Sequence, residues 1–165
     1  MQGLPFNTKG QTLMIPITGH TQLTGLLGSP VAHSISPMMH NTGFQALELD
    51  YAYLCFDVKE NKLQDAVKGL RALNVKGFNL TMPNKNKILE YLDDLSPAAR
   101  LIGAVNTVEN RDGRFVGHNT DGIGFMRSVR EQGLHVKGKT ITLMGIGGAA
   151  TAICTQAALD GAGRI

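Results

Sequence analysis

Short apolar runs alternate with amphipathic segments along this chain of 165 residues. Residues 23–28, 51–56 and 75–80 form apolar runs with the length of buried strands. Residues 36–47 follow a helix-start signal, and residues 63–73 repeat apolar side chains at helical spacing. Strands and helices that alternate in this way favour a mainly parallel sheet with helices on both faces. The sequence therefore predicts an α/β fold.

Two serine–proline pairs predict where helices begin. Ser36 and Ser96 are expected to be N-caps, and each precedes a proline that suits the first helical position. A further helix is expected at residues 85–92, before the second of these pairs.

A hairpin is predicted in the middle of the chain. Residues 104–108 and 114–117 are expected to be its strands. The turn at residues 110–113 ends in Asp-Gly, which tolerates the positive φ angles that such turns require. Residues 121–132 are then expected to form a helix that stops at Gly133.

The last part of the chain predicts a strand, a glycine-rich turn and a helix, at residues 140–144, 145–150 and 151–159. Glycines in such a turn let the backbone approach a pyrophosphate, whose charge lies at the helix N-terminus. This is the first β-turn-α unit of a Rossmann domain. Since its second strand would begin near Ile165, we expect the chain to carry a truncated cofactor half.

Composition narrows the classes of function. The chain is 42% hydrophobic and 18% charged, with a net charge of +3 that is too small and too scattered to indicate nucleic-acid binding. Cys55 and Cys154 lie far apart in apolar stretches and are expected to be reduced. No metal-ligand spacing, signal peptide or membrane-length apolar run is present in the sequence, so we expect a cytoplasmic protein without a metal.

Polar side chains follow several predicted strands at the ends where ligands gather in α/β sheets. They are neutral hydrogen-bonding groups together with one ammonium and one carboxylate. Such a set suits a small polyhydroxylated ligand, because each hydroxyl needs donors and acceptors. The residues are Ser34, Ser36, Asn79, Thr81, Lys85, Asn106, Thr107, Asn119, Thr120 and Asp121.

Each of these residues also has an ordinary structural interpretation. Ser36 and Asp121 could be helix caps, and Asn79 and Asn106 could satisfy the backbone of turns. Lys85 could be a solvated lysine at a helix start. The local sequence leaves these alternatives open.

The motifs that contain these residues occur in a specific order. Residues 34–37 are Ser-Ile-Ser-Pro, 79–85 are Asn-Leu-Thr-Met-Pro-Asn-Lys, 103–107 are Gly-Ala-Val-Asn-Thr, and 119–122 are Asn-Thr-Asp-Gly. Together with the glycine-rich turn, they resemble the signature series of the shikimate dehydrogenase family. Many members have an aromatic residue where this chain has Asn84, and in this the chain resembles the quinate/shikimate dehydrogenase branch. This departure leaves the substrate range and the cofactor choice open.

The resemblance implies a role for each matching residue. Lys85 and Asp121 match the catalytic pair, and Ser34 and Ser36 match the serines that hold the substrate carboxylate. The remaining matches to substrate-binding positions are Asn79, Thr81, Asn106 and Thr120. The matches to the cofactor-binding turn are Gly145, Ile146, Gly147, Gly148 and Ala149.

The implied activity is the reversible reduction of 3-dehydroshikimate to shikimate with NADP or NAD, on the route to aromatic amino acids. Quinate is a further candidate substrate, and the protein is expected to be a monomer or a homodimer. The implied domains are a leader (1–20), a substrate-binding domain (21–122), a bridging helix and linker (123–138) and the start of the cofactor domain (139–165). The alternative is a truncated, catalytically silent substrate-binding module.

Overall fold

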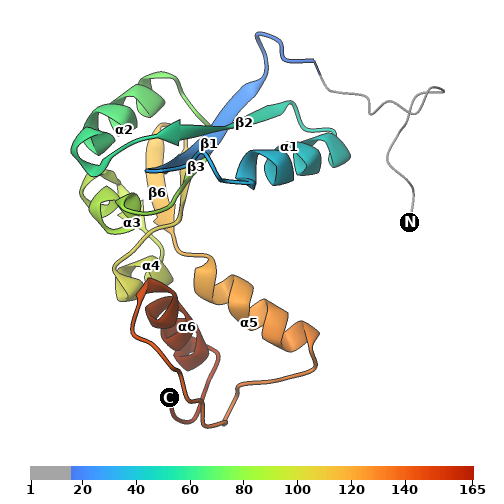
Figure 1. Cartoon of the computed structure of the whole chain (residues 1–165), viewed down its shortest axis with the longest axis vertical. Helices are drawn as coiled ribbons and strands as arrows, with labels where there is room; N and C mark the ends of the chain where they lie inside the picture. The colour runs from blue at the N-terminus through green and yellow to red at the C-terminus, as the bar shows by residue number, and fades with distance from the viewer. Residues whose placement is uncertain (1–15) are drawn as a thin grey trace, which may run out of the picture.

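The computed structural model describes residues 16–165, so most of the expected leader at residues 1–20 lies outside the described residues (Figure 1). The centre is a six-stranded sheet in the order β2-β1-β3-β5-β6-β4. β5 runs antiparallel to both of its neighbours, and the remaining pairs are parallel. The predicted, mainly parallel α/β fold is confirmed. The strands are β1 (Gln22–Gly28), β2 (Tyr51–Asp57), β3 (Gly77–Leu80), β4 (Asp94–Leu95), β5 (Thr107–Arg111) and β6 (Arg114–His118).

Helices precede or follow these strands along the chain. The helix expected at residues 85–92 is a short α-helix that tightens into a 3₁₀ turn, as helix ends often do. The α-helices are α1 (Ser36–Ala46), α2 (Leu63–Ala72), α3 (Asn84–Lys87), α4 (Pro97–Ile102), α5 (Asp121–Glu131) and α6 (Gly148–Leu159). The 3₁₀ turns are η1 (Glu60–Lys62) and η2 (Ile88–Tyr91).

Both faces of the sheet are covered, as predicted. Successive residues of a strand point to opposite faces, so Leu27 and Leu26 of β1 enter different cores. Leu27 belongs to the larger core, which includes Val67 of α2. Leu26 packs with Tyr53 of β2, and Phe44 of α1 lies against this second cluster. α1 therefore covers one face of the sheet, while α2, η2 and α4 cover the other.

The two predicted helix caps differ in outcome. Ser96 caps α4 as predicted, because its hydroxyl accepts a 3.3 Å hydrogen bond from the N–H of Ala99. The prediction for Ser36 is wrong, since α1 begins at Ser36 itself and Ile35 is the N-cap. The Ser34 hydroxyl instead accepts from the N–H of Ser36 at 3.2 Å. The Ser36 hydroxyl is therefore not used in capping.

The predicted hairpin turn is confirmed by positive φ angles of 53° at Asp112 and 89° at Gly113. Its first strand begins at Thr107, later than predicted. The N–H of Val105 bonds to the Lys85 carbonyl at 2.8 Å, so this part of the chain packs against α3 before joining the sheet. β4 was not predicted because two residues are too short to show a period.

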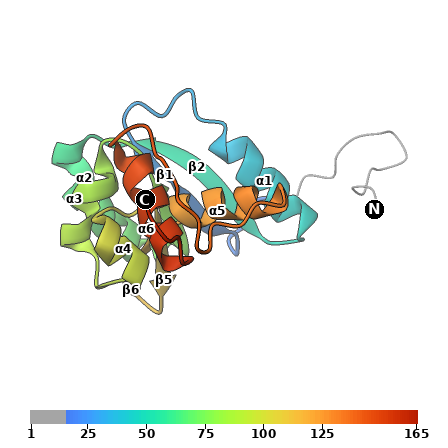
Figure 2. The same cartoon turned by 90° about the horizontal axis from the view of Figure 1, so that it is seen from below.

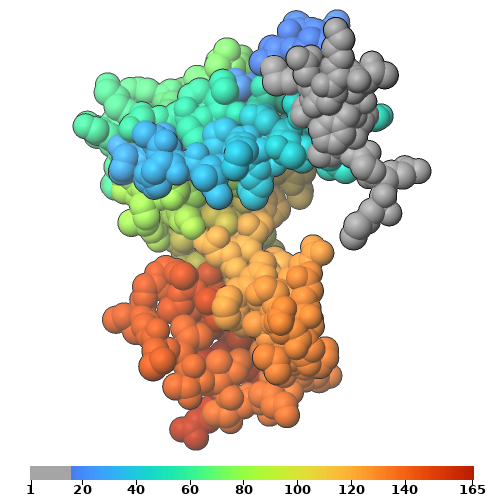
Figure 3. Space-filling model, turned by 45° about the vertical axis from the view of Figure 1, so that its right-hand side comes forward, coloured from blue at the N-terminus to red at the C-terminus, as the bar shows by residue number. Residues whose placement is uncertain are grey.

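α5 leaves the sheet and packs against α6, which also contacts α4 (Figures 1 and 2). Gly122 permits this close approach, because a Cβ atom there would lie 2.3 Å from the carbonyl oxygen of Ala152. In the space-filling view, the orange and red segments form a lower lobe below a narrower waist (Figure 3). α5 thus extends away from the sheet, and its role as a bridge between two domains stays a prediction.

The strand predicted at residues 140–144 is wrong. Only an isolated bridge joins Thr140 to Arg164, and the N–H of Ile141 bonds to the Arg164 carbonyl at 2.8 Å. Met144 and Ile146 are 97% and 100% exposed. Apolar composition alone does not make a strand, since the backbone also needs a continuous partner to form a ladder.

Three further observations complete the fold. No helix within residues 16–165 is long and apolar enough to cross a membrane. Across the same residues, no group of three or more His, Cys, Asp or Glu side chains could hold a metal ion. Cys55 and Cys154 are both free and half-buried.

Candidate active site

A pocket of about 670 Å³ lies where β1 and β3 end, between the start of α1 and the start of α5. All the residues expected to bind substrate line it, although they come from separate parts of the chain. These residues are Ser34, Ser36, Asn79, Thr81, Lys85, Asn106, Thr120 and Asp121. The structure therefore brings together the side chains that the family resemblance selected, whereas Thr107 and Asn119, which the strand-end pattern also selected, line adjoining pockets instead.

Lys85 and Asp121 form an ion pair in this pocket, with 2.7 Å between Nζ and Oδ2. The Lys85 side chain is only 26% exposed, so the structure does not support the interpretation of a fully solvated lysine. Asp121 begins α5 but does not cap it, because the N-cap is Thr120 and the Asp121 N–H bonds to Oδ1 of Asn119. Its carboxylate is thus directed to the pocket.

Asn106 holds the second oxygen of this carboxylate. Its Nδ2 donates to Oδ1 of Asp121 at 2.7 Å and to Oγ1 of Thr120 at 2.9 Å. Its Oδ1 accepts from the main-chain N–H of Thr120 at 2.9 Å. Because a main-chain N–H can only donate, this contact fixes which way the amide of Asn106 faces. Both oxygens of Asp121 are therefore engaged, and the carboxylate is held in one orientation.

The loop after β1 supplies the two serines at the N-terminus of α1. Ser34 is occupied with the N–H of Ser36, whereas the Ser36 hydroxyl makes no hydrogen bond within residues 16–165. The start of an α-helix favours negative charge, since its first N–H groups lack partners in the helix. This end of the pocket suits a carboxylate.

Close packing shapes the floor of the pocket. Gly28 ends β1, and a Cβ atom there would lie 2.2 Å from Cγ2 of Thr81. The N–H of Thr81 bonds to the carbonyl of Leu27 at 3.0 Å, which ties this loop to β1. Only glycine leaves room for Thr81 at this position.

Two pocket residues were missed by sequence reasoning as site residues. His40 stacks on Tyr53, with ring centroids 4.1 Å apart and planes 9° apart, and both line the pocket. Burial lowers the pKa of His40 and raises the pKa of Tyr53, which in both cases favours the neutral form of the ring. No local pattern marks these residues, because the strand alternation predicts only that Tyr53 is buried.

A second pocket, of about 350 Å³, lies between the first pocket and the start of α6. Lys85, Thr81 and Asp121 line both pockets, while Gly148 and Ala149 line only the second. Gly145 has a φ of 121°, which favours glycine, and α6 begins after Gly147. The glycine-rich turn thus presents the N-terminus of α6 at the pocket that Lys85 and Asp121 also line, whereas Gly145, Ile146 and Gly147 do not line this pocket.

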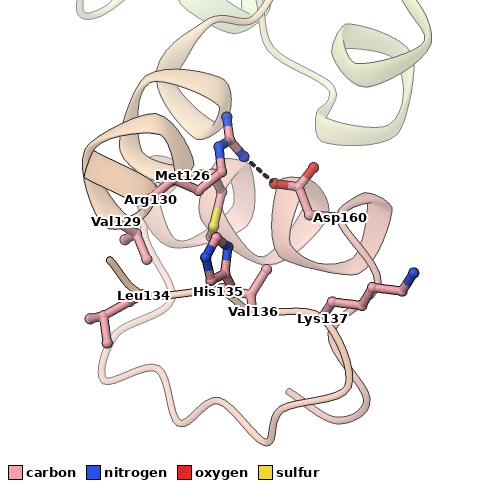
Figure 4. A pocket seen from close by; sticks show the side chains of 8 residues that line it. All are labelled: Met126, Val129, Arg130, Leu134, His135, Val136, Lys137 and Asp160. Atoms are coloured by element: carbon pink, nitrogen blue, oxygen red, sulfur yellow. Dashed lines mark hydrogen bonds and ion pairs between the residues drawn. The ribbon is translucent and has the colours of Figure 1, made fainter. Parts of the chain in front are cut away.

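A third hollow, of about 190 Å³, lies apart from these groups, between α5, the following linker and α6 (Figure 4). Arg130 and Asp160, which both line this hollow, form an ion pair at 3.0 Å. None of the predicted site residues lines it. The ion pair joins α5 to the end of α6, and the hollow is best described as part of this packing.

These features define an α/β domain whose ammonium–carboxylate pair lines both a polar pocket and an adjoining pocket at a glycine-rich turn. The chain belongs to the shikimate dehydrogenase family: the model of the shikimate dehydrogenase substrate binding domain matches residues 26–108.

Individual relatives agree with this assignment. A shikimate dehydrogenase (NADP(+)) of Listeria monocytogenes is 58% identical over 149 residues, covering 90% of this chain and 51% of the relative. The chain thus spans about half the length of the curated relatives that it matches.

Solved structures show the same fold. The structure of Listeria monocytogenes shikimate 5-dehydrogenase in complex with shikimate and NAD matches with a TM-score of 0.88 and 56% identity, over 92% of this chain and 52% of that one. The ligand-free 5-ketofructose reductase of Gluconobacter sp. strain CHM43 matches with a TM-score of 0.84 and 43% identity, over 88% and 52% of the two chains.

Proposed function

We propose that this chain provides the substrate half of an NAD(P)-dependent shikimate dehydrogenase, which interconverts 3-dehydroshikimate and shikimate. Quinate is a further candidate substrate. One observation carries the proposal: the Lys85–Asp121 pair lines both the pocket of polar side chains and the pocket at the glycine-rich turn. A hydride donor and its acceptor can meet only where two such pockets adjoin.

The proposed roles follow from the contacts of each side chain. The nicotinamide, when bound, supplies or accepts the hydride at the ring carbon. Lys85 gives the proton to the oxygen on that carbon during reduction and takes it back during oxidation. Asp121 positions the ammonium through its 2.7 Å contact and accepts from the substrate hydroxyl. Ser34 and Ser36 bind the substrate carboxylate at the start of α1.

The remaining assignments extend this proposal. Asn79, Thr81, Asn106 and Thr120 bind the ring hydroxyls, and residues 145–149 bind the pyrophosphate of NADP or NAD. Residues 21–122 form the substrate-binding domain, 123–138 the bridge, and 139–165 the start of the cofactor domain. The enzyme works in the cytoplasm as a monomer or a homodimer.

Calorimetric titration of the chain with shikimate tests the substrate assignment. Shikimate should bind, and Ser36→Ala should weaken binding about tenfold, the usual effect of one hydrogen bond to a charged group. Ser128→Ala is the matched control, because Ser128 bonds only to its own helix. 5-Ketofructose has no carboxylate, so its binding should be weak and insensitive to Ser36→Ala. A chain that binds 5-ketofructose better than shikimate contradicts the proposal.

The second candidate is a catalytically silent substrate-binding module of such an enzyme. It is favoured by the absence of a strand at residues 140–144 and by the exposure of Ile146 within the cofactor turn. Absorbance of the reduced nicotinamide separates the two. Shikimate binding without cofactor reduction supports the silent module, and reduction by this chain alone rules it out.

A further inference from the structure

Tyr53 lines the substrate pocket, and its hydroxyl makes one hydrogen bond there. Its side chain is buried, and its hydroxyl donates to Oδ1 of Asn79 at 2.8 Å. Nδ2 of the same amide donates to the main-chain carbonyl of Asn106 at 3.2 Å. Because a carbonyl can only accept, this contact fixes the direction in which the Asn79 amide faces. Tyr53 is therefore bound to the oxygen of an amide that lines the substrate pocket.

Thr107 links this amide to the next one. Its Oγ1 accepts from Nδ2 of Asn79 at 3.0 Å, so its own proton goes to Oδ1 of Asn106, also at 3.0 Å. The amide of Asn106 is fixed independently by the N–H of Thr120. Two main-chain groups thus determine the direction of every hydrogen bond in the array.

All the donors in this array point the same way. Tyr53 donates to Asn79, and Asn79 donates to Thr107. Thr107 donates to Asn106, which in turn donates to Asp121. Asp121 also accepts a hydrogen bond from Lys85. Hydrogen bonds that run in one direction polarise and strengthen one another in a partly buried site. The array ends on the carboxylate that pairs with the proposed proton donor.

We infer that Tyr53 and Thr107 are positioning residues of this site. They hold the side-chain amides of Asn79 and Asn106 in the orientation in which these amides can bind the substrate hydroxyls and Asp121. The inference rests on the proposed function. Thr107 lines an adjoining groove and not the substrate pocket, so its influence on a ligand passes through the two asparagines. Tyr53 lies outside the motifs that carry the family resemblance, and Thr107 ends the motif at residues 103–107 but is not among the matches to substrate-binding positions.

The surroundings of Tyr53 allow its hydroxyl to be removed without moving the ring. His40 stacks on the ring at 4.1 Å. The side chain of Asn41 bonds to both main-chain groups of Tyr53, at 2.8 Å to its N–H and at 3.0 Å to its carbonyl. Tyr53→Phe therefore deletes one donor and keeps the packing. Thr107→Val similarly removes the hydroxyl at nearly constant shape.

The test measures shikimate affinity by calorimetry and the side-chain amide signals of Asn79 and Asn106 by NMR, in the full 165-residue chain. Tyr53→Phe and Thr107→Val should each weaken shikimate about three- to tenfold, the usual effect of one buried hydrogen bond. Thr107→Ser keeps the hydroxyl and should restore affinity. Tyr51→Phe is the matched control, because the Tyr51 hydroxyl makes no hydrogen bond within residues 16–165 and its ring packs on Phe44.

The NMR signals of the two side-chain amides distinguish a loss of positioning from a general loss of stability. Thr107→Val should shift both pairs of signals, and Tyr53→Phe should shift those of Asn79 first, in the absence of ligand. Normal shikimate affinity in both variants, or unchanged amide signals, overturns the inference. If the unaltered chain does not bind shikimate, the proposed function fails, while the amide signals still decide whether the array exists.

Discussion

Nζ of Lys85 lies 2.7 Å from Oδ2 of Asp121, although 36 positions separate the two residues. Lys85 follows β3 at the start of α3, and Asp121 follows β6 at the start of α5. The sheet brings these two starts together because β3 and β6 run in the same direction on either side of β5. The pair is thus a consequence of topology, and it lies where α5, the helix that precedes the glycine-rich turn, leaves the sheet.

Replacing Lys85 should stop the chemistry and spare most of the binding. Loss of a general acid–base group lowers turnover by about 10²- to 10⁴-fold. Lys85→Ala should show this loss in the rate of nicotinamide reduction, measured in a protein that includes a complete cofactor domain. Shikimate affinity, measured by calorimetry, should change much less, since the serines and asparagines remain in place.

Lys87→Ala is the matched control for this variant. Lys87 lies on the same short helix, but it points to Glu90, at 2.7 Å, and does not line the substrate pocket. Its replacement should leave turnover within about twofold, as surface changes usually do. Near-normal turnover in Lys85→Ala, or equal losses in both variants, would remove Lys85 from the mechanism.

The sequence predicted the sheet domain well because local and global signals agree there. The strand at residues 23–28 and the helix at residues 63–73 match β1 and α2 closely, since β1 buries apolar side chains on both faces of the sheet and α2 buries one apolar side. The Asp112–Gly113 turn was predictable from the positive φ angles that it requires. The spacing of apolar residues and the residues of the turn were therefore sufficient to predict these elements.

The failures have a common physical cause, which is dependence on distant partners. The apolar run at residues 140–144 reads as a strand but finds only Arg164 beside Thr140. Ser36 has the form of an N-cap, yet the N–H of Met39 bonds to the carbonyl of Ile35, so the helix begins one residue earlier. Tyr53 joins the site only because β2 and β3 flank β1, which no local pattern reveals.

The segment between Ile141 and α6 should exchange its amide hydrogens rapidly. The N–H groups of residues 142–147 donate no backbone hydrogen bond, whereas those of α6 from Thr151 onward have partners one turn earlier. Hydrogen-exchange mass spectrometry should therefore show little protection for residues 142–147 and clear protection at Ala157, which is fully buried.

Addition of NADP provides the control for this measurement. If residues 145–149 bind the pyrophosphate, their exchange should slow while that of β2 does not change. Strong protection throughout residues 142–147 in the ligand-free monomer would show that a strand forms there after all.

Asp93 should make the stability of the sheet domain depend on pH. The N–H of Phe115 bonds to its carboxylate at 2.6 Å and Arg71 pairs with it at 2.9 Å, and these contacts lower the pKa of Asp93. A carboxyl group with a lower pKa in the folded state stabilises the fold above its unfolded pKa. That contribution is lost as the pH falls through the folded pKa.

Asp93→Asn should therefore destabilise the chain by about 1 kcal/mol near neutral pH, a value reduced for the partial exposure of the carboxylate. The difference from the unaltered chain should shrink below about pH 4, where the unfolded state binds the proton before the folded state does. Urea unfolding at several pH values measures this. Asp112→Asn, in the exposed turn, is the control, and an equal effect of pH on both variants contradicts the assignment.

Two glycines of α5 should respond in opposite ways to alanine, because only one of them faces α6. A Cβ atom at Gly122 would lie 2.3 Å from the Ala152 carbonyl oxygen, while one at Gly124 would meet nothing within 4 Å. Gly122→Ala should push the two helices apart and cost about 1–3 kcal/mol, as overpacking usually does. Gly124→Ala should stabilise the chain by about 0.5–1 kcal/mol through helix propensity alone. Thermal unfolding should show a lower melting temperature for Gly122→Ala and a higher one for Gly124→Ala. Exchange at Ala157 should rise only in Gly122→Ala, and if it rises in neither variant, α6 does not depend on its contact with α5 for stability.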